Sequence, residues 1–187
     1  MRIVTNGVFL EAHVGDIAQQ PGIAAVVNAA NAELMPGGGV AGAIHAAAGP
    51  ELATVCAPLA PIAPGEAAIT PAFDLPNEKI IHCLGPVYGH DRPEAEILES
   101  CYRSSLELAE ENMLASVATP AISTGAFGYP IDEAAEIACR TVAAMTAGLR
   151  HVQVVRFVLY SQKDYDVFAR ELVRAAAHAR QNGEAAA

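Results

Sequence analysis

The sequence predicts an α/β fold, a three-layer α/β/α sandwich around a central mixed, mostly parallel sheet. Short apolar segments typical of strands alternate along the chain with longer segments of helical periodicity. The stretch VQVVRFVLY at 152–160 is almost continuously apolar, as a strand covered on both faces requires. The chain has 187 residues, 52% of them hydrophobic and 17% charged, which suits one compact domain. We expect this domain to span residues 1–180 and residues 181–187 to form a frayed tail.

The first half of the chain alternates strand signals with one helix signal. Residues 2–14 alternate as strand residues do, and the turn dipeptide Asn6-Gly7 divides them into two short strands. The apolar run at 23–31 is expected to be a buried strand with asparagines at its carboxyl end. The remaining expectations are a helix over 40–48, stopped by Gly49 and Pro50, and strands over 67–70 and 79–84.

The second half contains three helix signals. Apolar residues recur at helical spacing between 93 and 113, which predicts a long amphipathic helix. The short apolar strand 116–122 follows, and then Pro130 and two acidic residues open a helix that reaches Gly148. After the strand at 152–160, residues 164–180 predict a last helix. Because parallel strands end at one edge of a sheet, the polar segments that follow them should converge on one crevice.

The charge and the cysteines exclude several classes of partner. A net charge of −10 argues against a nucleic-acid partner, so any phosphate should be bound by backbone N–H groups. The cysteines form no CxxC pair and are expected to be buried free thiols, neither a metal site nor a disulfide framework. No stretch approaches the roughly 18 apolar residues of a membrane span, and no secretory segment opens the chain. We therefore expect a cytoplasmic protein with no membrane partner.

Two glycine-rich segments follow predicted strands and lead into predicted helices. They are PGGGVAG at 36–42 and STGAFGYP at 123–130. An isolated glycine triplet is more often a flexible surface loop, but two such loops at helix N-termini can hold a diphosphate between backbone amides. The glycines also fit G-x-G-x-x-G, which raises a nicotinamide-dependent oxidoreductase as an alternative. The acidic residue that a Rossmann unit places about 20 residues later has no good match here.

Several motifs in the same order resemble those of macrodomains, the ADP-ribose-binding modules. They are GDI, VVNAAN, PGGGVAGAIHAAAGP, IIHCLGP and STGAFGYP, and the resemblance runs from Val14 to Tyr160. It implies a ligand, which is ADP-ribose, an ADP-ribosylated protein or O-acetyl-ADP-ribose, and no metal or separate cofactor. The ligand-binding residues that the resemblance implies are Asp16, Ile17, Asn28, Asn31, Gly37, Gly38, Gly39, Val40, Ala41, Ser123, Thr124, Gly125, Ala126, Phe127, Gly128, Tyr129 and Tyr160.

The resemblance implies that these residues contact different parts of the ligand. Asp16 accepts a hydrogen bond from the adenine amino group and the Ile17 amide helps to fix the ring, although an aspartate after a strand also caps helices. Asn31 binds the distal ribose, whereas Asn28 mainly braces the loop. The segments 37–40 and 123–129 enclose the diphosphate, with Phe127 against the distal ribose. Tyr160 packs on adenine. Without the resemblance, Phe127 would be a core residue and Tyr160 an ordinary strand-end tyrosine.

Ala41 determines which catalytic mechanism the sequence allows. The well-known hydrolase branch of macrodomains has G-V-D-G-A-I-H where this chain has Gly39 to His45, so its aspartate is replaced by Ala41. Alanine cannot act as a base, and hydrolysis must then use a water held by Asn31, loop amides and a substrate phosphate oxygen. His45 is the other catalytic candidate, with a packed or orienting role as its alternative, and His82 is expected to be structural.

The sequence therefore predicts an ADP-ribose-binding macrodomain that hydrolyses ester-linked mono-ADP-ribose by substrate-assisted attack of water. The substrates would be ADP-ribosylated aspartate or glutamate side chains, or O-acetyl-ADP-ribose. The alternative is a module that binds ADP-ribose without turnover.

Overall fold

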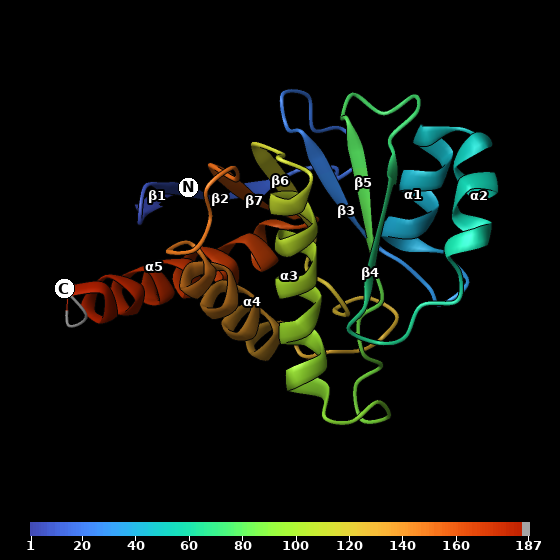
Figure 1. Cartoon of the computed structure of the whole chain (residues 1–187). Helices are drawn as coiled ribbons and strands as arrows, with labels where there is room; N and C mark the ends of the chain where they lie inside the picture. The colour runs from blue at the N-terminus through green and yellow to red at the C-terminus, as the bar shows by residue number, and fades with distance from the viewer. Residues whose placement is uncertain (185–187) are drawn as a thin grey trace.

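The computed structural model describes residues 1–184 and has one sheet between two layers of helices (Figure 1). The strands are β1 (Arg2–Thr5), β2 (Val8–Val14), β3 (Ala25–Ala29), β4 (Ala67–Pro71), β5 (Lys79–Cys83), β6 (Ser116–Thr119) and β7 (Val154–Leu159). The helices are α1 (Gly39–Ala48), α2 (Glu51–Cys56), the short 3₁₀ helix η1 (Ala57–Leu59), α3 (Glu94–Glu111), α4 (Ile131–Met145) and α5 (Gln162–Glu184).

The sheet is mixed and mostly parallel, as predicted. Its strand order is β1-β2-β7-β6-β3-β5-β4, and the five strands from β2 to β5 are parallel to one another. The edge strands β1 and β4 run antiparallel to their neighbours. The carboxyl ends of β2, β7, β6, β3 and β5 therefore lie along one edge, where the connecting loops can form a site.

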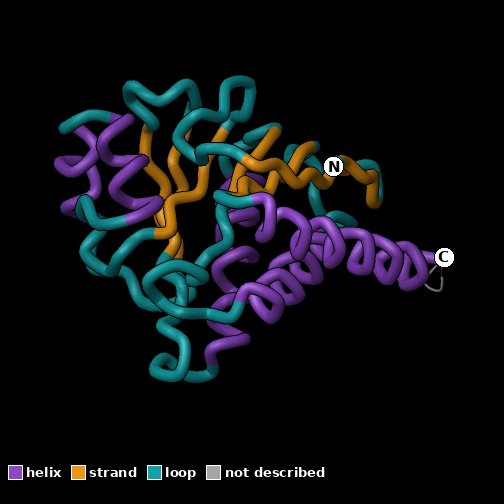
Figure 2. Tube along the Cα trace, turned by 180° about the vertical axis from the view of Figure 1, so that it is seen from behind, coloured by secondary structure: helices purple, strands orange, loops and turns teal. Residues whose placement is uncertain are grey.

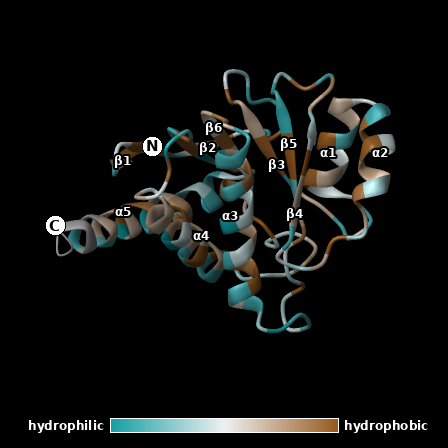
Figure 3. Ribbon diagram, in the orientation of Figure 1, coloured by the Kyte–Doolittle hydropathy of each residue, from teal (hydrophilic) through white to brown (hydrophobic). Residues whose placement is uncertain are grey.

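Each face of the sheet has its own core, because successive strand residues point to opposite sides. In β3, Ala25 and Val27 join a core formed with α3, α4 and α5, whereas Val26 joins the core beneath α1 and α2. Figure 2 shows the strands lying between these helices from behind. In Figure 3, α4 and α5 carry both hydrophobic and hydrophilic residues, as helices with one buried face should. The helices thus cover both faces, which confirms the predicted three-layer sandwich.

The predicted element order is confirmed, with two differences. The pair α2 and η1 was not predicted, because Gly49-Pro50 signals the end of a helix. Pro50 is in fact the N-cap of α2, a place where a missing N–H costs nothing. The helix expected at 164–180 is α5, which begins at Gln162 and runs through Glu184. Four residues of the expected tail are therefore helical, and the other three, 185–187, lie outside the described residues.

The four cysteines are buried free thiols, as predicted. Within residues 1–184, no three His, Cys, Asp or Glu side chains are grouped as ligands of a metal ion. No single helix of this part of the chain is long and apolar enough to cross a membrane. The segments 39–48 and 51–59 reach that length and composition only together, across a bend of 112°.

Candidate functional site

The glycine-rich segment after β3 presses against the start of α1. A Cβ on Gly42 would collide with the carbonyl oxygen of Gly37, so the loop can reach the helix only because residue 42 has no side chain. Gly39 has a φ of 58°, a conformation that favours glycine. Gly38 is the N-cap of α1, and it supplies no capping side chain. The first turn of α1 also lacks an acidic residue. Its amides and the positive end of its dipole are therefore available to an anion, with no carboxylate of this turn competing for them.

The loop after β6 forms a second set of backbone donors. Three amides of the predicted segment close the loop on itself: Thr124 donates to Ala121, Gly128 to Gly125 and Tyr129 to Ser123, over N–O distances of 3.4, 3.0 and 3.0 Å. These three amides are therefore engaged within the protein. In the described chain, the amides of Gly125, Ala126 and Phe127 donate to no protein acceptor and are left for a ligand.

The two sets of amides lie on one side of the molecule. β3 and β6 are hydrogen-bonded neighbours that run parallel, so the loops that follow them leave the same edge of the sheet. Phe127 is half-buried and packs on the same core cluster as Val40 of α1. The structure thus brings the segments 37–41 and 125–127 to the same edge of the sheet.

A third loop supports the second set of amides, and the sequence did not reveal it. The Tyr88 amide donates to the Phe127 carbonyl over 2.9 Å, and the Tyr88 ring lies edge-on to Tyr129 at 4.8 Å between centroids. A Cβ on Gly85 would collide with the Ser123 hydroxyl oxygen, so the loop after β5 touches the loop after β6 closely. The only sequence signal was Gly85-Pro86, which marks a turn without naming its partner.

Asn31 holds the loop between β3 and the glycines. Its Nδ2 donates to the Met35 carbonyl over 2.8 Å, and its Oδ1 accepts from the Met35 amide over 3.0 Å. A carboxamide has a second N–H and a second acceptor site, so both ends of the Asn31 group can still bond a sugar diol. A Cβ on Gly37 would lie 3.3 Å from Asn31 Nδ2, which places the carboxamide directly beside the glycine loop.

Asn28 lies in a buried polar chain beneath α1. Its Nδ2 contacts His82 Nδ1 at 3.1 Å, and His82 Nε2 contacts the Thr70 hydroxyl at 2.9 Å. Because an amide Nδ2 can only donate, His82 Nδ1 accepts and the ring proton sits on Nε2, facing Thr70. Burial and the neighbouring His45 lower the pKa of His82 to about 4, which keeps the ring neutral. These side-chain contacts of Asn28 and His82 are therefore internal to the fold.

His45 belongs to the same buried region. It is buried on α1, its ring centroid is 6.5 Å from that of His82, and its Nε2 has no partner within the described residues. Burial lowers its pKa, and a hydrogen bond to the Leu34 backbone partly opposes this shift. These contacts favour the packed, orienting role over that of a general base. Ala41 lies one helical turn earlier, and the residue is only 4% exposed, so its methyl group is buried beside the glycine loop.

Asp16, Ile17 and Tyr160 lie together at the carboxyl ends of β2 and β7. The Gly15 amide donates to the Leu159 carbonyl over 3.0 Å, which ties the two strand ends together. Asp16 Oδ1 accepts from the Ala18 amide over 2.9 Å, so Asp16 caps a turn, and no helix begins there. The ring of Tyr160 is 95% exposed and available for stacking. An exposed aromatic ring, a carboxylate and a backbone amide can together receive a purine base.

A groove away from these loops lies at the opposite edge of the sheet. It has a volume of about 410 Å³ and is lined by residues of α4 and α5 and by Asn6, just before the start of β2. Arg140 and Arg174 line this groove, paired with Glu99 over 3.6 Å and with Glu171 over 3.0 Å, and they are its side-chain alternative for binding an anion.

Comparisons with known proteins agree with this geometry. The Macro domain family profile matches residues 27–138. The O-acetyl-ADP-ribose deacetylase of Klebsiella pneumoniae is 46% identical over 167 residues, which cover 87% of this chain and 95% of the relative. A macro domain-containing protein of Chlorobaculum tepidum is 49% identical over 149 residues, which cover 79% of this chain and 87% of the relative.

Solved structures show the same fold. The Oceanobacillus iheyensis macrodomain with ADP superposes with a TM-score of 0.89 at 41% identity, covering 93% of this chain and 95% of that one. The Trypanosoma brucei macrodomain in complex with ADP-ribose gives a TM-score of 0.79 at 33% identity, covering 86% and 68% of the two chains. On the strength of the fold, the paired glycine loops and these relatives, the chain belongs to the macrodomain family.

Proposed function

We propose that this chain binds ADP-ribose at the carboxyl edge of its sheet and hydrolyses ADP-ribose esters. The observation that carries the proposal is the presence of two sets of backbone amides that have no protein acceptor within residues 1–184, which we call cradles. One is the start of α1, and the other is formed by residues 125–127. An acidic chain can hold a diphosphate with such amides without a lysine or arginine. The Klebsiella relative, named O-acetyl-ADP-ribose deacetylase, supports an ester as the substrate.

The ligand would extend along the strand ends. Adenine would lie between Asp16, the Ile17 amide and the Tyr160 ring, since these groups meet where β2 and β7 end. The diphosphate would lie between the two cradles. The distal ribose would reach Asn31, whose carboxamide keeps one donor and one acceptor after bonding Met35.

Hydrolysis would proceed by attack of water on the carbonyl carbon of the ester. A new C–O bond forms from the water, the bond between that carbon and the ribose oxygen breaks, and the products are ADP-ribose and a carboxylic acid. Ala41 offers no base, so the water would give its proton to a diphosphate oxygen of the substrate, which passes a proton to the leaving ribose oxygen. Asn31 and the loop amides would hold the water and ribose in line, and this positioning supplies most of the acceleration.

The substrate class follows from the same arrangement. Acetyl esters of ADP-ribose and the aspartyl or glutamyl esters of mono-ADP-ribosylated proteins share the acyl–ribose bond. Either could extend from the distal ribose past the exposed glycine loop. Partners would then be small ADP-ribose esters or ADP-ribosylated proteins.

A second function is favoured by Ala41 itself. Where a carboxylate assists the reaction in the hydrolase branch, this chain places a buried methyl group. A module that binds ADP-ribose tightly and turns esters over negligibly would have the same cradles and the same Asn31.

One assay separates these functions. The chain is incubated with O-acetyl-ADP-ribose, with and without a metal chelator, and acetate release is followed by NMR while ADP-ribose binding is measured by calorimetry. We expect release above the buffer rate in both samples. Tight binding without release would support the binding module, and the absence of both binding and release would contradict the proposal.

A further inference from the structure

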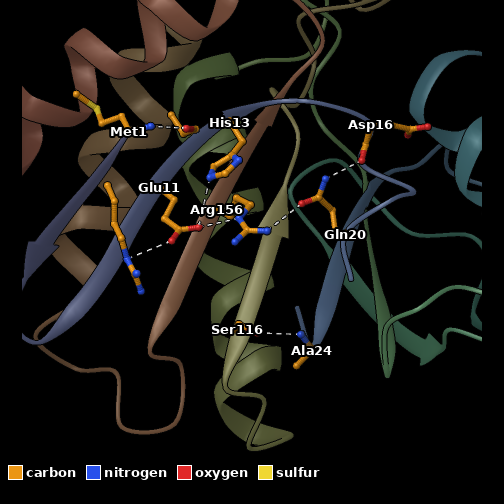
Figure 4. A network of polar contacts seen from close by, with 10 residues as sticks. Met1, Glu11, His13, Asp16, Gln20, Ala24, Ser116 and Arg156 are labelled. Carbon is orange, nitrogen blue, oxygen red and sulfur yellow. Dashed lines mark hydrogen bonds and ion pairs between the residues drawn. The ribbon is translucent and has the colours of Figure 1, made fainter. Parts of the chain in front are cut away.

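A cluster of charged side chains lies on β2 and β7 (Figure 4). It is on the face of the sheet whose other strands are covered by α1 and α2. The Glu11 side chain is only 8% exposed, and its two oxygens lie 2.7 Å from Arg156 Nε and 3.2 Å from Arg2 Nε. His13 Nε2 lies 3.9 Å from the same carboxylate. A carboxylate this buried needs its cations, so Arg156 is fixed in place by Glu11.

Arg156 extends from this cluster toward the adenine end of the crevice. While its Nε is engaged by Glu11, its Nη1 donates to Gln20 Oε1 over 3.2 Å. A guanidinium has no acceptor, so it forces the Gln20 amide to present Oε1 to Arg156 and its NH₂ group to the other side. On that side Gln20 Nε2 donates to the Asp16 carbonyl over 2.7 Å, as Figure 4 shows.

Gln20 is held firmly enough to pass the orientation set by Arg156 on to the Asp16 carbonyl. The residue is 7% exposed, and its own carbonyl accepts from Asn77 Nδ2 over 2.9 Å, so its backbone is held from a third segment. The Asp16 carbonyl and the Ile17 N–H belong to one peptide plane and point in opposite directions. By holding that carbonyl, Gln20 therefore aims the Ile17 N–H away from the cluster.

We propose that Gln20, oriented by Arg156 and Glu11, is a positioning residue that sets the adenine selectivity of the crevice. This inference rests on the proposed function, in which Asp16 and the Ile17 amide receive the base. Together with the Gln19 amide, which donates to the same Asp16 carbonyl over 3.1 Å, the Gln20 side chain fixes the peptide whose N–H faces the ring and the turn from which the Asp16 carboxylate projects. Asp16 is exposed, and Gln20 holds its main chain from the buried side.

Selectivity can be measured with two ligands that differ only in the base. Adenine presents an amino donor and a ring-nitrogen acceptor, which match a carboxylate and an N–H. Hypoxanthine presents a carbonyl acceptor and a ring N–H at the same places, so both contacts are lost. The ratio of the affinities for ADP-ribose and for its hypoxanthine analogue therefore reports the geometry of the Asp16–Ile17 peptide.

Three variants test the inference. Gln20→Glu keeps an oxygen for Arg156 but loses the NH₂ group that holds the Asp16 carbonyl, and Gln20→Leu loses both contacts. We expect both to lower the affinity ratio by roughly three- to tenfold, the range that one hydrogen bond gives, with KM for the ester rising by more than kcat falls. Gln19→Glu places the same charge on the neighbouring exposed residue and should keep the wild-type ratio.

The possible outcomes distinguish a failure of the proposed Gln20 role from a failure of the proposed function. A wild-type ratio in both Gln20 variants would overturn the inference, as would an equal loss of affinity for both ligands, which indicates general disruption. If the wild-type chain binds both ligands equally, the adenine end does not select its base, and the inference fails while diphosphate binding stands. If the wild-type chain binds neither ligand, the proposed function fails and the inference fails with it.

Discussion

Lowering the pH from 7 to 5 should destabilise the folded chain through His82. The pKa of this buried ring is about 4 in the folded state and 6.5 in its ordinary range, because burial and His45 disfavour its protonated form. The unfolded chain therefore takes up a proton as the pH falls through 6.5, while the folded chain resists protonation until about pH 4. The contribution of the neutral His82 ring to the free energy of unfolding is present in full above pH 6.5. It declines as the pH falls and is lost below about pH 4.

The magnitude follows from the difference between the two pKa values. Each pKa unit corresponds to about 1.4 kcal/mol, so the full loss is about 3 kcal/mol, of which about 2 kcal/mol has appeared at pH 5. The protonated ring would also place an N–H opposite Asn28 Nδ2, where His82 Nδ1 now accepts. The loss is large beside the stability of an ordinary domain.

Urea unfolding at pH 7 and at pH 5 measures this loss in the wild type and in His82→Gln. Glutamine offers an oxygen to Asn28 and an amino group to Thr70 without titrating in this range. The free energy of unfolding should fall by about 2 kcal/mol less in the variant. Burial also lowers the pKa values of His13 and His45, and these residues contribute the remaining slope in both proteins. An equal pH-dependent loss in the wild type and in His82→Gln would show that His82 does not cause it. The exposed His151→Gln serves as control.

Three further predictions concern the glycine loop and its neighbours. Ala41→Asp should raise kcat for ester hydrolysis about tenfold or more, since it gives the first turn of α1 a base; acetate release tests this, and an equal gain from Ala41→Asn would contradict it. Gly42→Ala should cost about 1–3 kcal/mol of unfolding free energy, because its Cβ collides with the Gly37 carbonyl oxygen. Gly38→Ala is the control, since its Cβ meets nothing within 4 Å, and equal melting temperatures for the two variants would rule the collision out. Asn31→Ala should lower kcat by more than it lowers ADP-ribose affinity, and equal losses in kinetics and calorimetry would remove its role with the reacting ribose.

Local signals in the sequence were sufficient to predict the elements that build the crevice. The apolar run before Asn28 and the glycines before Val40 defined a strand, a loop and a helix, and each has its expected type. The helix α2 was missed because Gly49-Pro50 has two meanings, a stop for one helix and a start for the next. The position of β7 between β2 and β6 depends on packing between distant segments, which no local pattern encodes.

The supports of the site could not be predicted in the same way. Arg156 and Glu11 are 145 residues apart in the chain, and Arg156 and Gln20 are 136 apart, so their contacts exist only in the folded sheet. A signal was nevertheless present, because a single arginine interrupts the apolar strand at 152–160. A lone charge inside a covered strand requires a partner. The hydrogen bonds that close the 123–129 loop gave no such signal, since they join main-chain groups.

The claim that a diphosphate is held by backbone amides is tested most directly by NMR. An amide spectrum of the ¹⁵N-labelled chain, recorded during titration with ADP-ribose, reports which N–H groups meet the ligand. We expect the largest shifts at residues 39–41 and 125–127, with further shifts at Asp16 and Ile17. Binding whose shifts gather instead at Arg140 and Arg174, in the groove between α4 and α5, would contradict it.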